Sequence, residues 1–161
     1  MCRVVLRGVT LEDLDTIYIW ENDPSLWEFG TYGAQYTMAE LCSSLILESQ
    51  SLILDGQLRK MIYCEDVAVG VVDLFEYNHN LNSAGVGILI DSAHRGRGFA
   101  SAALRGVELL LASEYGIEKL WSNVAQSNLS SVNLFRGCGY EESAQEGELF
   151  LFQKNIKKNN I

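Results

Sequence analysis

The stretch that decides the fold is GILIDSAHRGRGFASAAL, from Gly87 to Leu104. Its first residues are apolar and β-branched, as in a strand, and from Phe99 onward the apolar residues have helical spacing. Between these parts, two arginines alternate with Gly96 and Gly98. The first turn of a helix has backbone N–H groups without helical partners and the positive end of the helix dipole. The stretch therefore predicts a strand, a tight loop and a helix start that suits an anion.

The residues of this loop match phosphate oxygens. Arg95 and Arg97 supply guanidinium groups, and the glycines adopt backbone conformations that are closed to other residues. A pyrophosphate is the ligand we expect, and the alternative is an ordinary helix start with solvated arginines. Neither common nucleotide motif matches: a dinucleotide fingerprint needs a third glycine where Ser101 stands, and a Walker A loop needs a Gly-Lys-Ser/Thr ending.

The length and net charge of the chain exclude several classes of protein. The chain has 161 residues, 48% of them hydrophobic, which predicts one globular domain over 1–161 with a polar tail over 154–161. A net charge of −9 argues against a nucleic-acid binder. It is compatible with a cationic partner such as an amine, and equally with acidity that serves solubility. The sequence contains no membrane-length apolar run and no signal-peptide pattern, so we expect neither a membrane partner nor secretion.

The cysteines predict no metal site. They stand far apart in the sequence and form no Cys-x-x-Cys pair, and the chain has only two histidines that could serve as further ligands. We expect four free thiols in a reducing cytoplasm, packed as small apolar side chains. These cysteines are Cys2, Cys42, Cys64 and Cys138.

The pattern of the whole chain predicts an α/β (α+β) domain around a mixed sheet. Two capping boxes mark helix starts, Thr10 with Asp13 and Thr37 with Glu40. The strands are expected over 4–7, 58–66, 67–78, 84–91, 119–124, 139–143 and 148–155. The helices are expected after each capping box and over 99–115 and 128–138.

Two motifs resemble those of a known family. RGRGFA, residues 95–100, resembles the R/Q-x-x-G-x-G/A signature of the acetyl-CoA-binding motif in the GNAT acetyltransferase superfamily. NLSSVNLFRGCGY, residues 128–140, is similar to that family's second motif. The N-terminal half resembles the branch of spermidine N-acetyltransferases and ribosomal-protein N-terminal acetyltransferases. The resemblance covers Val4 to Lys154 and implies a mostly antiparallel sheet, with a V-shaped splay between two adjacent strands and about four helices.

The resemblance also implies a coenzyme site. Acetyl-CoA would place its thioester end and pantetheine arm along the strand before the loop, and its pyrophosphate on the loop. Val124 would line the opposite wall, and Asn128 would hydrogen-bond the pantetheine arm, cap its helix, or do both. The residues implied to bind acetyl-CoA are Leu89, Ile90, Arg95, Gly96, Arg97, Gly98, Phe99, Ala100 and Asn128.

The implied chemistry is direct attack of an amine on the thioester. A lysine-like amine has a pKa of about 10.4, so a proton must be removed before attack. We favour Asp73 as the base over Glu76 on the opposite face, with a structural carboxylate as the alternative. Many relatives carry a tyrosine as the acid where this chain has Phe135. Tyr140 is a weaker candidate, and its alternative is a packed aromatic ring.

The acceptor is expected to be a primary amine of a small molecule or polyamine, or a protein N-terminus. Trp27, Glu28 and Tyr32 are candidate substrate-binding residues, or else the small core of their own loop. The closing strand pair is shorter than in the spermidine branch, which weakens a polyamine assignment. The alternative function is a catalytically weak acyl-CoA sensor or scaffold, which Phe135 motivates. The resemblance further implies a homodimer.

Overall fold

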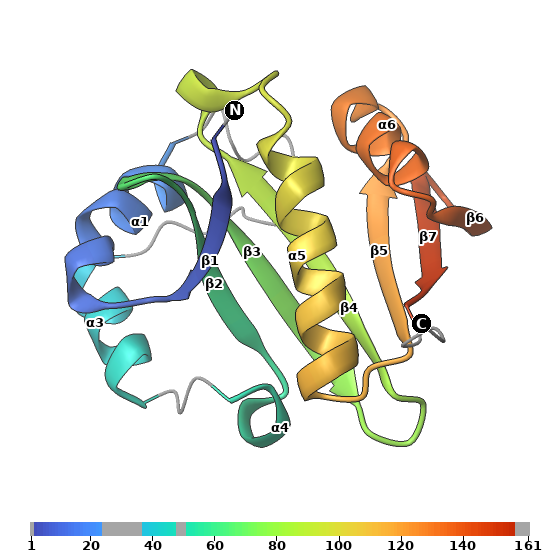
Figure 1. Cartoon of the computed structure of the whole chain (residues 1–161), viewed down its shortest axis with the longest axis horizontal. Helices are drawn as coiled ribbons and strands as arrows, with labels where there is room; N and C mark the ends of the chain where they lie inside the picture. Colours follow the sequence, from blue (N-terminus) through green and yellow to red (C-terminus); the bar gives the residue numbers. More distant parts are fainter. Residues whose placement is uncertain (1, 24–36, 48–50, 157–161) are drawn as a thin grey trace.

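The computed structural model describes residues 2–23, 37–47 and 51–156. In this part of the chain, seven strands form one sheet with the order β1-β2-β3-β4-β5-β7-β6 (Figure 1). The strands are β1 Val4–Gly8, β2 Leu58–Cys64, β3 Val67–Asn78, β4 Ser83–Ile90, β5 Lys119–Ala125, β6 Glu141–Glu146 and β7 Leu149–Asn155.

Two of the helical segments begin where local side chains satisfy the first N–H groups. Thr10 and Asp13 form the predicted capping box, and so do Thr37 and Glu40. The helical elements are η1 Leu11–Asp13, α1 Leu14–Glu21, α3 Met38–Leu47, α4 Leu52–Asp55, η2 Ser92–His94, α5 Phe99–Glu114 and α6 Leu129–Gly137. The short helix α4 was not predicted, because one turn is too short to show a helical period.

Neighbouring strands are antiparallel except β4 and β5, which are parallel. Their pairing runs only from Ser83 with Lys119 to Gly85 with Trp121, although β4 continues to Ile90. Beyond Gly85 the two strands diverge, as Figure 1 shows between the green and orange strands. The predicted V-shaped splay is therefore confirmed.

Apolar side chains cover both faces of the sheet. On one face, the α5 residues Leu104, Val107 and Leu111 are fully buried in the larger core cluster. On the other face, α1 packs Ile17 and Trp20 onto the sheet in a second cluster. The helical spacing from Phe99 onward thus predicted the buried face of α5 correctly. Figure 1 shows α5 crossing the sheet where β4 and β5 separate.

A polar network lies beneath α5. Glu108 is 8% exposed and accepts hydrogen bonds from the Tyr140 hydroxyl at 2.9 Å and from Lys154 Nζ at 2.8 Å. Lys154 Nζ also donates to the Cys138 carbonyl at 2.9 Å. The network joins α5 to β7 and to the turn after α6, so it links the two halves of a sheet whose central pairing is short. Buried polar groups of this kind favour one arrangement when all are satisfied.

The thiol prediction is wrong for two of the four cysteines. Cys2 and Cys64 form a disulfide, whereas Cys42 and Cys138 are free. The cause is strand pairing: β1 and β2 are antiparallel and place Val4 opposite Cys64, which brings the Cys2 and Cys64 Cα atoms to 5.9 Å. Residues 62 positions apart in sequence give no local sign of this proximity.

The predicted tail also begins too early. Strand β7 continues through Lys154 and Asn155, and the next residue, Ile156, is buried with its amide donating to the Glu118 carbonyl. The remainder of the predicted tail, 157–161, lies outside the described residues. Over the ranges that the structure describes, no helix has the length and apolar character needed to cross a bilayer.

Candidate functional site

A hollow of about 160 Å³ lies at the open end of the splay. The end of β4, the loop after it, the first turn of α5 and the first turns of α6 form its walls. The residues that line it are Ile88, Leu89, Ile90, His94, Arg95, Gly96, Gly98, Phe99, Ala100, Ser101, Ser130, Ser131 and Leu134. The hollow therefore lies where the glycine-arginine loop meets the gap between the diverging strands.

The loop has the backbone conformation that its glycines predict. Gly96 and Gly98 have φ of 74° and 81°, in the left-handed region that residues with a side chain rarely adopt. A Cβ at either glycine would meet no atom within 4 Å, so the space above the loop is open. Gly98 is the N-cap of α5, and the first helical bond runs from the Ala102 amide to the Gly98 carbonyl at 3.1 Å.

The amides of the loop and of the first helical turn face no acceptor of the described chain. From residue 96 to residue 101, no backbone N–H donates to a carbonyl or side chain in the part that the structure describes. These donors, the helix dipole and the Arg95 guanidinium form a cradle for an anion. We call this set, residues 95–101, the amide cradle.

The edge of β4 beyond Gly85 offers backbone groups to the same hollow. The Ile90 carbonyl accepts from Arg95 Nε at 3.2 Å, so it is directed away from β3. By contrast, a Cβ on Gly70 of β3 would lie 2.2 Å from the Leu89 carbonyl, which therefore faces β3. Because backbone groups alternate along an antiparallel strand, Ile88 is expected to face the open side with Ile90.

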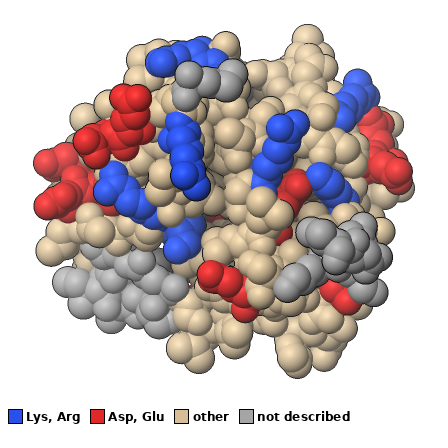
Figure 2. All heavy atoms as spheres, viewed as in Figure 1, with Lys and Arg blue, Asp and Glu red and all other residues tan. Residues whose placement is uncertain are grey.

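Basic side chains gather on this face of the molecule although the whole chain is acidic. In Figure 2, which has the viewpoint of Figure 1, Lys and Arg lie mainly over the middle and at the end with the loop. Asp and Glu lie at the two side edges and also in the lower middle of the same face, away from the end with the loop. The distribution favours an anionic ligand at the amide cradle.

Most residues predicted to bind the coenzyme meet in the hollow. These are Leu89, Ile90, Arg95, Gly96, Gly98, Phe99 and Ala100. Arg97 does not line it, and Val124 is buried. Asn128 is buried and forms the alternative contact, since its Oδ1 accepts from the Ser131 amide at 3.2 Å and caps α6.

Sequence reasoning missed several residues of the lining. Ser130, Ser131 and Leu134 follow Asn128 within two helical turns, so their spacing from the cap was a usable signal. His94 directly precedes Arg95, yet a single histidine carries no pattern of its own. The other lining residues that were not predicted are Ile88 and Ser101.

Asp73 is held in an ion pair. Arg59 donates from Nε to Asp73 Oδ1 at 2.6 Å and from Nη2 to Oδ2 at 3.0 Å, and its Nη1 donates to Glu21 Oε1 at 2.7 Å. Both Asp73 oxygens thus accept from one guanidinium, an arrangement that matches the structural alternative. We call Glu21, Arg59 and Asp73 the carboxylate cluster.

Tyr140 is placed as a packed aromatic residue. It is 4% exposed, it does not line the hollow, and its ring packs edge-on against Phe135 at 5.0 Å between centroids. Burial, and next the charge of Glu108, raise the pKa of Tyr140 far above its ordinary value. The geometry therefore supports the alternative for Tyr140 and not an accessible acid. The candidates Trp27, Glu28 and Tyr32 lie outside the described residues.

Comparison with known proteins agrees with this geometry. Residues 3–141 match the model of the acetyltransferase (GNAT) domain family. The chain belongs to the GNAT acetyltransferase family. The predicted activity is thereby confirmed: this protein is an N-acetyltransferase that transfers an acetyl group from acetyl-CoA to an amine.

Spermidine acetyltransferases are among its relatives. The spermidine N(1)-acetyltransferase of Escherichia coli (strain K12) is 27% identical over 154 residues, which cover 91% of this chain and 75% of that protein. The Vibrio cholerae serotype O1 protein of the same name is 30% identical over 154 residues, covering 92% and 84%. A solved V. cholerae spermidine N-acetyltransferase, in complex with CoA and spermine, has a TM-score of 0.84 at 21% identity and covers 96% of both chains. The predicted GNAT fold is confirmed.

The placement of Tyr140 predicts that Tyr140→Phe weakens folding and spares catalysis. Removing the hydroxyl leaves a buried Glu108 oxygen without its donor, so we expect the free energy of unfolding to fall by about 1–2 kcal/mol. Urea unfolding and steady-state kinetics measure the two effects, with Tyr77→Phe as the control because its hydroxyl is exposed. A large loss of kcat with unchanged stability would restore Tyr140 as the acid.

Proposed function

We propose that this GNAT enzyme acetylates a primary amine of a small aliphatic polyamine, with the coenzyme diphosphate bound on the amide cradle. One observation carries the proposal: the strands diverge after Gly85, and the open end of the gap between them meets a run of amides without acceptors in the described chain. The open space above Gly96 and Gly98 leaves room for phosphate oxygens close to the backbone.

The chain's own groups suggest how the coenzyme is held. The amide cradle, with Arg95, is suited to the diphosphate, and the free edge of β4 at Ile88 and Ile90 is suited to the amides of the pantetheine arm. Ser131 and Leu134 of α6 form the opposite wall. When bound, acetyl-CoA supplies a thioester whose carbonyl carbon is open to attack by nitrogen.

The reaction is a direct transfer. The acceptor ammonium loses one proton to solvent through water, and the nitrogen then bonds to the carbonyl carbon. The carbon–sulfur bond breaks, and the nitrogen gives up a second proton to water as it becomes the amide nitrogen. An amide on the open edge of β4 is positioned to stabilise the negative charge that develops on the carbonyl oxygen.

The leaving thiolate is proposed to depart without a side-chain acid. Phe135 has no hydroxyl and is buried, and the Tyr140 hydroxyl donates to Glu108. A thiol has an ordinary pKa of about 8.5, so its anion is a tolerable leaving group at neutral pH.

The sheet face beneath α1 is suited to a cationic acceptor. Two carboxylates around one guanidinium leave the carboxylate cluster with one net negative charge, and Asp73 lies opposite Gly87 of β4. Two residues along β3, Phe75 pairs with Gly85 of β4, which in turn pairs with Trp121 of β5. The Phe75 and Trp121 rings pack edge to face across Gly85, with their centroids 5.4 Å apart. Aromatic rings beside a net negative charge favour ammonium groups joined by alkyl chains.

The names of the relatives also support a polyamine. Two spermidine acetyltransferases match nearly the whole chain, and the solved relative was bound to spermine. The closing turn remains short here, because β6 ends at Glu146 and β7 begins at Leu149. A protein N-terminus therefore stays the second candidate acceptor. A homodimer and a cytoplasmic location stay predictions.

An acceptor panel tests the function. Purified protein and acetyl-CoA are incubated with spermidine, spermine, an aliphatic diamine, a peptide with a free N-terminus, or no amine, and free thiol is measured. We expect thiol release to depend on the polyamine and mass spectrometry to find one acetyl group on it. Preference for the peptide would contradict the polyamine acceptor, and release independent of every amine would contradict acetyl transfer.

The ion pair predicts that Asp73→Asn raises the KM for the amine and changes kcat little. Loss of the charge makes the carboxylate cluster neutral, and we expect KM to rise about fivefold. If Asp73 were the base, kcat would instead fall about 100-fold or more at unchanged KM. Asp66→Asn, in the exposed turn between β2 and β3, is the matched control for net charge.

A further inference from the structure

His94 lies in the hollow although no motif pointed to it. The short turn η2 holds its backbone, because the His94 amide donates to the Asp91 carbonyl at 2.8 Å and Asp91 Oδ1 accepts from Ala93. The imidazole packs edge-on against Phe99, with the ring centroids 6.3 Å apart. The ring is therefore supported by Phe99 and lines the same hollow as the amide cradle.

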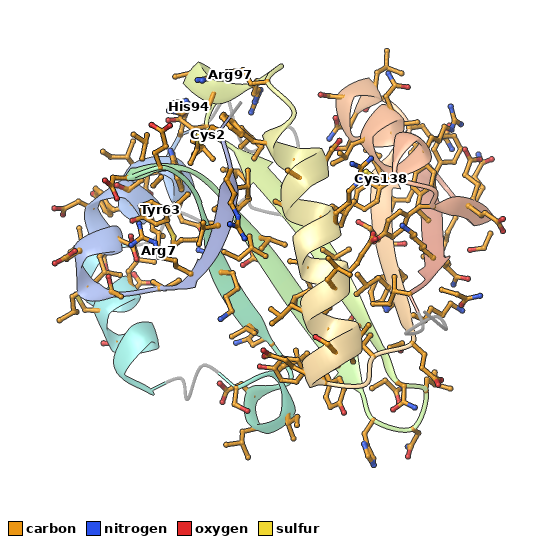
Figure 3. All side chains as sticks on the ribbon, viewed as in Figure 1. Cys2, Arg7, Tyr63, His94, Arg97 and Cys138 are labelled. Atoms are coloured by element: carbon orange, nitrogen blue, oxygen red, sulfur yellow. A yellow bond between two sulfur atoms is a disulfide. The ribbon has the colours of Figure 1, made fainter. Side chains whose placement is uncertain are left out.

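Arg97 contacts His94 instead of the hollow. Its Nη1 lies 3.4 Å from His94 Nδ1, and its guanidinium lies 5.0 Å from the centroid of the Phe99 ring. Figure 3 shows the labels of His94 and Arg97 side by side at the end of the molecule that carries the loop. Arg97 was predicted to bind the pyrophosphate, yet it does not line the hollow.

This contact determines which imidazole nitrogen carries the proton. A guanidinium only donates hydrogen bonds, so His94 Nδ1 must accept with its lone pair. The proton of the neutral ring is then on Nε2, because the partner of one ring nitrogen selects the tautomer. His94 consequently has an N–H donor available for an anion.

We propose that His94 is a coenzyme-binding residue whose Nε2–H donates to a phosphate oxygen, and that Arg97 is a positioning residue that fixes this tautomer. The inference rests on the proposed placement of the diphosphate on the amide cradle. The phosphate belongs either to the diphosphate or to the 3′-phosphate of the coenzyme, since both present the same oxygens.

Substitutions of His94 that keep, move or remove its N–H donor test whether His94 binds the phosphate. Calorimetry with CoA should give a dissociation constant about tenfold weaker for His94→Ala, as expected for a lost hydrogen bond to a charged group. His94→Gln should bind within about twofold of the unsubstituted protein, because its amide nitrogen is spaced like Nε2, and His94→Asn should not. His79→Ala, at the other histidine, is the matched control.

A double-mutant cycle tests the role of Arg97. We expect Arg97→Ala to weaken CoA binding about threefold, and His94→Ala with Arg97→Ala to bind no worse than His94→Ala alone. Additive losses would show that Arg97 meets the phosphate independently and would overturn its positioning role. Unchanged binding by His94→Ala would overturn the proposal, whereas no binding by the unsubstituted protein would overturn the coenzyme placement itself.

A second ligand identifies the phosphate. The same variants are titrated with dephospho-CoA, which keeps the diphosphate and lacks the 3′-phosphate. If His94→Ala also weakens the binding of dephospho-CoA about tenfold, the contact is with the diphosphate. If His94→Ala binds dephospho-CoA as tightly as the unsubstituted protein does, the contact is with the 3′-phosphate; both results support the proposal. Melting curves of each variant confirm that the loop substitutions leave the fold intact.

Discussion

The structure depends on the early end of hydrogen bonding between β4 and β5. A buried backbone group without a partner costs free energy comparable to a lost hydrogen bond, so strands rarely diverge inside a core. Here the strands separate after Gly85, and their open edge meets the amides at the start of α5 that have no acceptor among the described residues. The fold thus creates a site from main-chain groups, and the buried contacts of Glu108 hold its two sides together.

The two substrates of the proposed reaction depend on different parts of the molecule. The coenzyme is proposed to meet mostly backbone, in a loop where Gly96 and Gly98 adopt left-handed conformations. The acceptor is proposed to meet side chains on the face beneath α1, where the carboxylate cluster lies. Side chains change without altering the fold, so a family that shares this coenzyme site accommodates many acceptors.

The parts predicted correctly from sequence depend on short-range signals. Thr10 with Asp13, and the glycines of the loop, act on groups within a few residues, and the sequence displays such spacings directly. Partners that only the tertiary fold brings together were not predicted: strand pairing joins Cys2 to Cys64 and Arg59 to Asp73, and the packing of α5 joins Glu108 to Tyr140. Their chain separations of 62, 14 and 32 residues leave no local pattern. His94 was missed for a different reason: a single histidine shows no pattern in the sequence, and its proposed role depends on the contact with Arg97.

The most direct test of the central claim is a two-dimensional ¹⁵N–¹H NMR titration of the labelled protein with CoA. Phosphate oxygens on the amide cradle would deshield the N–H groups that bind them. We predict that the resonances of Gly96, Gly98 and the first turn of α5 move most, with smaller changes at Ile88 and Ile90 on β4. Saturable binding that leaves the Gly96 and Gly98 resonances in place would contradict the account.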